Sequence, residues 1–474
     1  MKNQFKRYIP SKIKDELDPI DYPRKDNLYT ILDLIIRKEI YYKNEKQNTY
    51  GFTEIPKAQF KELLPSSDNL HDDIEFLIDR GYILRNDFYT IGKKSKSYRI
   101  GSKYLGKTQD VTITNKNINK RILRQIQKAR EIKAKRLEFA QSEYFKSFKI
   151  DVQGAMRAIQ RQTIKELKHL GLTVGLILTD ADAVNILENP RESLAHKMKL
   201  VHSKKVHQFH NILHRYMLYN IRINAINDGF LFFKRNDTNG RLDSNLTSLP
   251  SFLRPYLISS ERLMYLDIKN SQPFFLFTLL KNKPEVDPEE LNRYAELVLN
   301  GKLYEFLMVE YLKHKGKELN RKQVKLMLCK VFYSKNTSFP EYKEFFGNLF
   351  PTIMQFIRDT NQKEHKTLAI QLQTMESFTV LDKVMVELQS KGIKPYTIHD
   401  GFICKESEAE TIKTVFYQES QELYGLAPSL HCDYIDIPQE EDEIDDNTTS
   451  ADDMIDAINS WQMEQDMLEG ELEW

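Results

Sequence analysis

Residues 263–273 read LMYLDIKNSQP, a short apolar run that ends on one carboxylate, Asp267. A short apolar run bounded by polar residues is typical of a buried strand. A carboxylate at the mouth of such a strand must face water, a cation or a partner, because an isolated buried charge is expensive. Taken alone, Asp267 indicates no more than a strand that ends at the surface.

A second apolar segment ends in the same way. Residues 396–398 lead into His399 and Asp400, and Gly401 allows a tight turn before residues 402–404 return as the second strand of a hairpin. Two strands that each deliver an aspartate to one sheet edge can hold two divalent ions about 4 Å apart. Magnesium prefers such oxygen ligands. Together the two aspartates therefore indicate a metal site.

The segment between these two strands contains a basic helix, NRKQVKLMLCKVFYSKN, residues 320–336. Arg321, Lys325 and Tyr333 are spaced by four and eight residues, so they share one face, and each four-residue step climbs about 6 Å. Arginine and lysine on that face can hold a triphosphate, and Tyr333 can pack near a base or template. The alternative is an ordinary basic surface helix whose apolar residues are buried.

A fourth segment, TNGRLDSNLTSLP, residues 238–250, places Arg241 directly after an Asn-Gly turn. In isolation Arg241 would be a turn arginine. Its position 26 residues before Asp267 changes that interpretation, because it then belongs to an ordered series of charged segments.

In this order the four segments resemble motifs of the family A DNA polymerases and of the related single-subunit phage and mitochondrial RNA polymerases. TNGRLDSNLTSLP resembles that family's TGR with NLQNIP, and LDIKNSQPFFL resembles DYSQIEL. RKQVKLMLCKVFY resembles RxxxKxxxFxxxY, and TIHDGFI resembles VHDE. LAIQLQTMESFTVLDKVM resembles the helix before the last motif. The resemblance covers about residues 230–437.

The resemblance implies an α+β fold of the right-hand polymerase type, with palm and fingers in residues 230–437. It implies that Asp267 and Asp400 are catalytic, and that Asp267, Ile268 and Asp400 bind two Mg²⁺ ions, with Mn²⁺ as an alternative. The implied nucleotide-binding residues are Arg321, Lys325, Tyr333 and Gln272. The implied primer-template residues are Arg241, His399 and Gln373. By analogy, a primer 3′-hydroxyl attacks the α-phosphate in line.

Three positions depart from the family pattern. Cys329 stands where the helix usually has Phe or Tyr, and Gly401 replaces the glutamate after the last aspartate. Gln272 stands where DNA polymerases have a glutamate that excludes ribose. Because Gln272 is large enough to obstruct a 2′-hydroxyl and its amide could also bind one, deoxynucleotides are favoured without ribonucleotides being excluded.

The rest of the chain is charged unevenly. Residues 101–250 hold 27 Lys and Arg against 13 Asp and Glu, whereas residues 436–474 hold 15 Asp and Glu and no Lys or Arg. A basic block beside the four motifs favours a surface that follows a nucleic acid backbone over an ordinary solvated face.

The first twenty residues lack the apolar core of a secretory signal, and no apolar run is long enough for a membrane span. A cytoplasmic location is therefore expected. Three scattered cysteines argue against a zinc site or a disulfide framework.

Together with the palm and fingers of residues 230–437, four further regions divide the chain. An extension, residues 1–25, precedes a winged-helix-like domain, residues 26–105. In that domain three helices, at residues 27–43, 55–64 and 70–80, are followed by strands at residues 82–84, 89–91 and 98–100. Residues 106–229 form a basic helical, thumb-like region, and residues 438–474 form an acidic, largely disordered tail that could dock a protein partner. The third helix, which would contact DNA in a winged-helix domain, is acidic. Two interpretations therefore stay open: the domain contacts DNA through its wing, or it binds a protein and no DNA. The wing residues are Lys93, Lys94, Lys96 and Arg99.

We therefore expect a template-directed polymerase that acts on a DNA primer-template with nucleoside triphosphates. No association with a membrane is expected. No acidic exonuclease pattern is visible in the N-terminal region, so proofreading is not expected. Size and the appended winged helix suggest replication of a plasmid, phage or other mobile element. The alternatives are an RNA polymerase or primase on the same palm, and a replication initiator or DNA-binding protein whose palm is no longer catalytic.

Overall fold

The computed structural model describes residues 5–41, 52–65, 69–87, 95–130, 148–173, 177–188, 203–229, 231 and 233–437. The described chain combines helices with small antiparallel sheets, in agreement with the expected α+β class. It divides into two compact units. Unit 1 takes the described residues through 231 together with Ser248–Ile258, and unit 2 takes Phe233–Thr247 and the described residues from 259 to 437.

Unit 1 begins with two small sheets and the helices between their strands. Strands β1 and β5 pair antiparallel, and a second sheet has the order β2-β4-β3. The elements are β1 (Lys6–Pro10), α1 (Ser11–Leu17), α2 (Lys25–Tyr41), β2 (Thr53–Glu54), α3 (Lys57–Leu63), α4 (Leu70–Asp79), β3 (Ile83–Asn86), β4 (Ser97–Ile100), η1 (Ser102–Tyr104) and β5 (Thr108–Thr112).

The apolar spacing of α2 explains its position in unit 1. Leu28, Ile31, Leu32, Ile35 and Ile36 are all buried, because they recur at the three- and four-residue intervals of one helix face. The helices α2, α3 and α4 and the strands β3 and β4 lie where the sequence predicts them. Their order is the one a winged-helix domain requires, and that interpretation stays a prediction. The predicted strand near Tyr89 lies outside the described residues.

The acidic helix α4 is anchored through one of its carboxylates. Asp73 is fully buried, and it accepts hydrogen bonds from Tyr22 Oη at 2.6 Å, Arg24 Nε at 2.9 Å and Asn27 Nδ2 at 2.8 Å. Asp72 in the same turn is exposed. Asp73 therefore fixes α4 to the start of α2.

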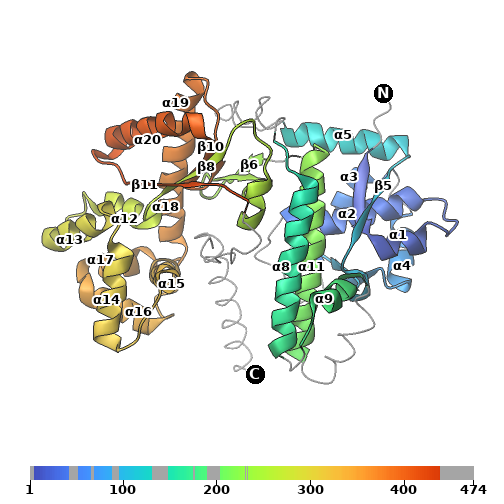
Figure 1. Ribbon diagram of the computed structural model, residues 1–474, viewed down its shortest axis with the longest axis horizontal. Helices are drawn as coiled ribbons and strands as arrows, with labels where there is room; N and C mark the ends of the chain where they lie inside the picture. Colours follow the sequence, from blue (N-terminus) through green and yellow to red (C-terminus); the bar gives the residue numbers. More distant parts are fainter. Residues whose placement is uncertain are drawn as a thin grey trace. The chain divides into compact units, whose positions relative to one another are not determined.

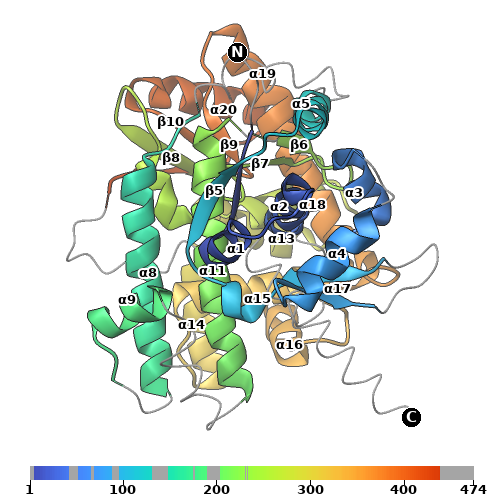
Figure 2. The ribbon, with the colours of Figure 1, turned by 90° about the vertical axis from the view of Figure 1, so that its right-hand side faces the viewer.

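The remainder of unit 1 is mostly helical where the structure describes it. Helices α8 and α11 run alongside each other in both views of the molecule (Figures 1 and 2), and η3 packs on α8. Helix α8 passes through Gly171 and ends at Thr173, whereas the sequence predicts a break near Gly171 and Gly175; Gly175 lies outside the described residues. The bounds are α5 (Lys116–Arg130), α8 (Val152–Thr173), α9 (Asp180–Glu188), α11 (Ser203–Asn227) and η3 (Ser251–Tyr256).

Unit 2 contains a four-stranded antiparallel sheet, a two-stranded ribbon of β6 and β7, and a large helical group. Its strands are β6 (Phe233–Arg235), β7 (Leu242–Ser244), β8 (Leu263–Ile268), β9 (Tyr396–Ile398), β10 (Gly401–Lys405) and β11 (Leu430–Tyr434). Its helices are α12 (Ser271–Leu280), α13 (Pro288–Leu299), α14 (Leu303–Lys315), α15 (Arg321–Tyr333), α16 (Pro340–Leu349), α17 (Pro351–Thr360), α18 (Thr367–Ser377), η4 (Phe378–Val384), α19 (Met385–Ser390), η5 (Glu406–Glu408) and α20 (Ala409–Tyr424).

The four-stranded sheet has the order β11-β8-β10-β9, so the two apolar segments that carry the aspartates become neighbours. Asp267 lies opposite Gly401, and Gly401 lies opposite Ile398 in the predicted hairpin. The sequence suggests that Gly401 makes the tight turn possible, but Gly401 does not have a positive φ. His399 instead takes the left-handed conformation, with φ 49°.

Helices α12 to α17 form one helical body with the start of α18, and Figure 1 shows them grouped below the sheet. Helix α15 begins at a reciprocal cap, in which Asn320 accepts from the Gln323 backbone and the Gln323 side chain accepts from Asn320 N. One apolar cluster runs through all of these helices, including Phe332 of α15 and Leu372 of α18. This body packs α15 together with α12, the helix that directly follows β8 of the sheet.

Helices α18, η4 and α19 continue into one another, because Ser377 and Met385 at the two junctions are both helical. The middle segment is a π-helix, which accommodates an extra residue and is often found at functional sites. Among the described residues, no helix combines the length and the apolar character needed to cross a membrane. The acidic tail, residues 438–474, lies outside the described residues.

Candidate active site

Asp267 and Asp400 are 133 residues apart in the chain and lie together at one edge of the unit 2 sheet. Asp267 pairs with Gly401 in the β8–β10 register, and the neighbouring Ile268 N donates to the carbonyl oxygen of Asp400 at 3.3 Å. Both carboxylates are half-buried. The fold thus brings the two predicted metal ligands side by side while leaving them partly accessible.

The electrostatics of this edge are unfavourable for two bare carboxylates. Burial raises the pKa of Asp267 well above its usual range, and the charge of Asp400 raises it further. The charge of Lys325 and a hydrogen bond from Tyr265 act in the opposite direction. Because like charges at a shared site repel, the edge favours a bound cation or proton.

The contact between Tyr265 and Gly401 explains why a glycine follows Asp400. Tyr265 Oη donates to Asp267 Oδ1 at 3.3 Å, and its ring covers Gly401. A Cβ at position 401 would lie 2.6 Å from Tyr265 Oη and 2.7 Å from Cε2. Glutamate at this position, the residue that the resembled family carries, is therefore incompatible with Tyr265 where it stands.

The oxygen donors at this edge suit magnesium better than a softer metal. Asp267 and Asp400 supply carboxylates, and hard divalent cations take oxygen ligands. Within the described ranges, no group of three or more His, Cys, Asp or Glu side chains is suited to hold a metal. Ile268 has a buried side chain, so only its backbone could contribute. Two carboxylates and a backbone oxygen fit a site completed by substrate phosphates and water.

Helix α15 supplies positive charge to the same edge. Lys325 is half-buried, and its charge lowers the pKa of Asp267. Arg321, one turn earlier, is exposed; its guanidinium carbon lies 5.0 Å from the ring centre of Tyr304, and its Nε lies 3.1 Å from Glu305 Oε1. Burial raises the pKa of Tyr304, and the charges of both aspartates contribute to the rise. The charges of the exposed arginine and of the carboxylate pair therefore both act on Tyr304.

A buried carboxylate, Glu376 of α18, connects three segments beside the aspartates. It is fully buried, and it accepts from Arg241 Nη2 at 2.6 Å, Ser271 Oγ at 2.8 Å and Gln272 Nε2 at 2.6 Å. Gln272 Oε1 in turn accepts from Tyr333 Oη at 2.7 Å. The charge of Glu376 also contributes to the raised pKa of Asp267, which lies nearby. We call these five residues the Glu376 cluster: Arg241, Ser271, Gln272, Tyr333 and Glu376.

No protein-family model matches the chain, and no curated protein does. Among solved structures, the chain is similar to the POL domain of Pol1 from M. smegmatis, in a complex with DNA primer-template and dNTP. The likeness is weak. The identity is 14% and the TM-score 0.44, over 67% of this chain and 72% of the other.

The turn that carries Arg241 is fastened to α18 and η4. Asn239 Nδ2 donates to Gln373 Oε1 at 2.8 Å, and Ser377 Oγ donates to the Asn239 carbonyl at 2.8 Å. At one end of the turn, Arg235 forms an ion pair with Asp382 through both terminal nitrogens. The predicted primer-template residues Arg241 and Gln373 are thus held from within unit 2.

The structure groups most of the predicted site residues. It brings Asp267, Asp400 and Lys325 to one edge, with His399 in the adjoining turn. Gln272, Tyr333 and Arg241 meet at Glu376, while Arg321 lies at the exposed start of α15. Every assigned role of these residues stays a prediction, since geometry alone does not test it.

Sequence reasoning missed Glu376 and Tyr265. Glu376 stands three residues after Gln373 in a mostly uncharged segment, and a charge at that spacing could have been flagged as a buried partner for Arg241. Tyr265 gave no such signal, because an aromatic residue in a strand is ordinary.

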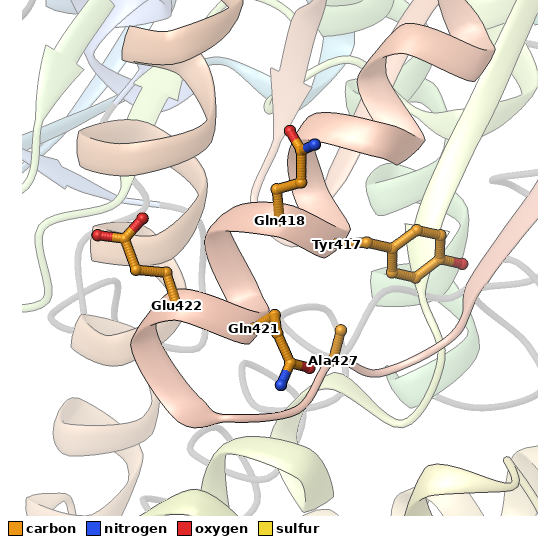
Figure 3. Close-up of a pocket in the computed structure, with 5 residues that line it drawn as sticks. All are labelled: Tyr417, Gln418, Gln421, Glu422 and Ala427. Carbon is orange, nitrogen blue, oxygen red and sulfur yellow. The ribbon is translucent and has the colours of Figure 1, made fainter.

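A surface pocket of about 550 Å³ lies elsewhere in unit 2 (Figure 3). Four of its lining residues come from α20 and the fifth from the loop that follows: Tyr417, Gln418, Gln421, Glu422 and Ala427. None of them belongs to the aspartate edge or to the Glu376 cluster. We assign it no part in the chemistry, because it contains neither the paired carboxylates nor the cations.

Proposed function

We propose that this protein is a template-directed nucleic acid polymerase, of the DNA-dependent DNA polymerase type, that works by two-metal nucleotidyl transfer. One observation carries the proposal: Asp267 and Asp400 converge at one sheet edge, where the charge of Lys325 acts on Asp267. The order of the four motifs along the sequence supports it. Two neighbouring carboxylates that repel each other can bind divalent ions, and the cationic residues of α15 can bind phosphates. This combination suits metal-assisted chemistry on a triphosphate.

Each residue at the edge has a role in this proposal. Asp267 and Asp400 would hold two Mg²⁺ ions, with the Ile268 backbone as a further ligand. When bound, such ions activate a primer 3′-hydroxyl and stabilise the departing pyrophosphate. Lys325 and Arg321 would bind the incoming phosphates from α15, and His399 would lie beside the primer terminus. Tyr265 would orient the Asp267 carboxylate.

The buried residues act differently from the exposed ones. Arg241 is 5% exposed and Gln373 7% exposed, and both bond to other residues of unit 2. We therefore assign them to holding the turn at residues 236–241 in the shape that meets the primer-template. Gln272 and Tyr333 would form the floor of the nucleotide pocket.

Unit 1 would supply the grip on nucleic acid. The helices α5, α8 and α11 of its second half contain part of the basic block, and basic helices hold duplexes through phosphates without reading sequence. The winged-helix interpretation of residues 26–105 belongs to the same proposal. Because Asp72 and Asp79 of α4 are exposed, we exclude α4 as the DNA-contacting surface. Of the wing residues, Lys96 and Arg99 are described, and Lys93 and Lys94 lie outside the described residues.

Primer extension with purified protein and magnesium tests the proposal. Deoxy- and ribonucleotides are compared on DNA and RNA templates, with Asp267→Asn and chelated metal as controls. Extension with either sugar that is lost in both controls supports a polymerase, and the preferred sugar decides between a DNA polymerase and an RNA polymerase or primase. A wild-type protein that binds primer-template but extends nothing would instead favour the inactive initiator.

Two broader parts of the proposal have their own tests. The acidic tail, residues 438–474, would dock a protein partner or occupy the basic surface as a mimic of phosphate charge; an unchanged rate and salt dependence after its deletion would remove the second role. Assignment to the replication of a plasmid, phage or other mobile element rests on size and the winged-helix interpretation alone. Loss of replication of such an element on deletion of the gene tests it.

A further inference from the structure

We propose that Glu376 is a positioning residue that locks the Gln272 amide in one orientation and thereby sets which sugar the nucleotide pocket accepts. This inference rests on the proposed function and extends it to a residue outside the four motifs. Glu376 supplies the carboxylate of the cluster, and Gln272 supplies the amide that donates a hydrogen bond to it.

The orientation of Gln272 follows from the chemistry of its neighbours. An ionised carboxylate only accepts hydrogen bonds, so the group that faces Glu376 Oε2 must be the Gln272 NH₂. The Arg241 guanidinium, 2.6 Å from Glu376 Oε1, keeps that carboxylate ionised because arginine is always charged. The amide oxygen then points to Tyr333 and accepts from its hydroxyl.

A locked amide discriminates differently from a free one. A free glutamine can turn its oxygen or its NH₂ toward a 2′-hydroxyl, which both donates and accepts. In this cluster the oxygen of Gln272 already accepts from Tyr333, and one NH₂ hydrogen is taken by Glu376. Gln272 therefore presents the same shape and the same polar groups to every incoming sugar. Without Glu376 the amide can rotate, and the pocket can adapt to either sugar.

The two side chains can also be exchanged without losing a partner. In a double variant that carries Gln272→Glu and Glu376→Gln, the amide oxygen of the introduced glutamine can still accept from Arg241. The two hydrogens of that amide can reach the introduced carboxylate and Ser271 Oγ, which stand where the two groups bonded to Glu376 Oε2 stand in the wild type. Gln272→Glu alone instead places two buried carboxylates within hydrogen-bond distance, where they repel.

The test is the ratio of kcat/KM for a deoxynucleotide to that for the matching ribonucleotide, in wild type, Glu376→Gln, Gln272→Glu and the double exchange. We expect Glu376→Gln to move the ratio about tenfold toward unity. A change of this size corresponds to the free energy of one charge-assisted hydrogen bond. We expect Gln272→Glu to lose activity with both sugars, and the double exchange to regain both activity and a ratio far from unity.

Glu290→Gln is the matched control, because Glu290 is a buried carboxylate of the same unit that accepts from Thr352 N and Ile353 N, away from the cluster. It should lower the melting temperature and leave the sugar ratio unchanged. Equal losses with both sugars in Glu376→Gln, or no rescue by the exchange, overturn the positioning role. If Glu376→Gln does not fold, the comparison of the double exchange with Gln272→Glu still tests the positioning role of Glu376. A wild type that extends primers without sugar preference overturns this inference alone, whereas one that extends nothing overturns the proposed function with it.

Discussion

Asp73 of unit 1 and Asp267 of unit 2 are both carboxylates that the fold withdraws from water, yet their surroundings differ. Asp73 is fully buried and accepts from a tyrosine, an arginine and an asparagine, so unit 1 neutralises its charge. Asp267 is half-buried beside a second carboxylate, and its pKa is raised rather than lowered by its surroundings. The comparison separates a carboxylate that stabilises a fold from one whose position costs stability and indicates function.

The largest expected effect is on activity at the aspartate edge. We expect Asp267→Asn and Asp400→Asn each to lower primer extension by at least about 10³-fold, because each removes a charge that the divalent ions require. Neither change should lower the melting temperature, since each removes repulsion between two neighbouring carboxylates. Single-turnover extension and thermal melting without divalent metal measure the two effects. A large loss of stability would mean that these aspartates resemble Asp73 after all.

The reverse pattern is expected at Asp73. We expect Asp73→Ala to lower the free energy of unfolding of unit 1 by about 3 kcal/mol, because it leaves Tyr22, Arg24 and Asn27 without their shared acceptor. Asp72→Ala, in the same helical turn but exposed, should stay within about 0.5 kcal/mol of wild type. Denaturant unfolding measures both. Equal effects of the two substitutions would remove the distinction between the buried and the exposed carboxylate of α4.

This contrast also shows what the sequence could predict. The apolar strands before Asp267 and Asp400 and the helix at 321–333 were predictable, because periodicity and strand ends are local signals. The pairing of β8 with β10 was expected from the two motifs and is confirmed. Local signals do not reveal which distant side chains satisfy one another, and so Glu376 and the three donors of Asp73 were not predicted. The sequence shows Gly401 only as a turn residue, because its contact with Tyr265 arises in the tertiary structure.

Lys343 extends the comparison to a buried cation in unit 2. It is 2% exposed, and its Nζ donates to the carbonyl oxygens of Ser334 and Lys335. Burial, with a smaller contribution from the charge of Arg358, lowers the pKa of Lys343 from 10.5 to about 8. Between these two values the unfolded chain binds a proton that the folded chain does not. Stability from this residue therefore rises with pH across that window.

The size of the Lys343 effect follows from the shift of its pKa. We expect the difference in unfolding free energy between wild type and Lys343→Met to change by about 3 kcal/mol in favour of wild type as pH rises from below 8 to above 10.5. Chemical denaturation of both proteins across this range measures it. Parallel pH profiles would show that Lys343 titrates like an exposed lysine.

The smallest expected effect lies at the contact that orients Asp267. Gly401→Ala places a Cβ 2.6 Å from Tyr265 Oη, so the tyrosine must move and lose its hydrogen bond to Asp267. We expect primer extension to fall by about tenfold, the value of one hydrogen bond to a charged group. Tyr265→Phe removes the same bond without the clash and should lose no more than Gly401→Ala. In a Tyr265→Ala background the alanine should cost little, because the atoms it meets are gone. If Gly401→Ala costs the same in both backgrounds, its effect comes from the backbone of the β9–β10 turn, and Tyr265 does not set the position of the carboxylate.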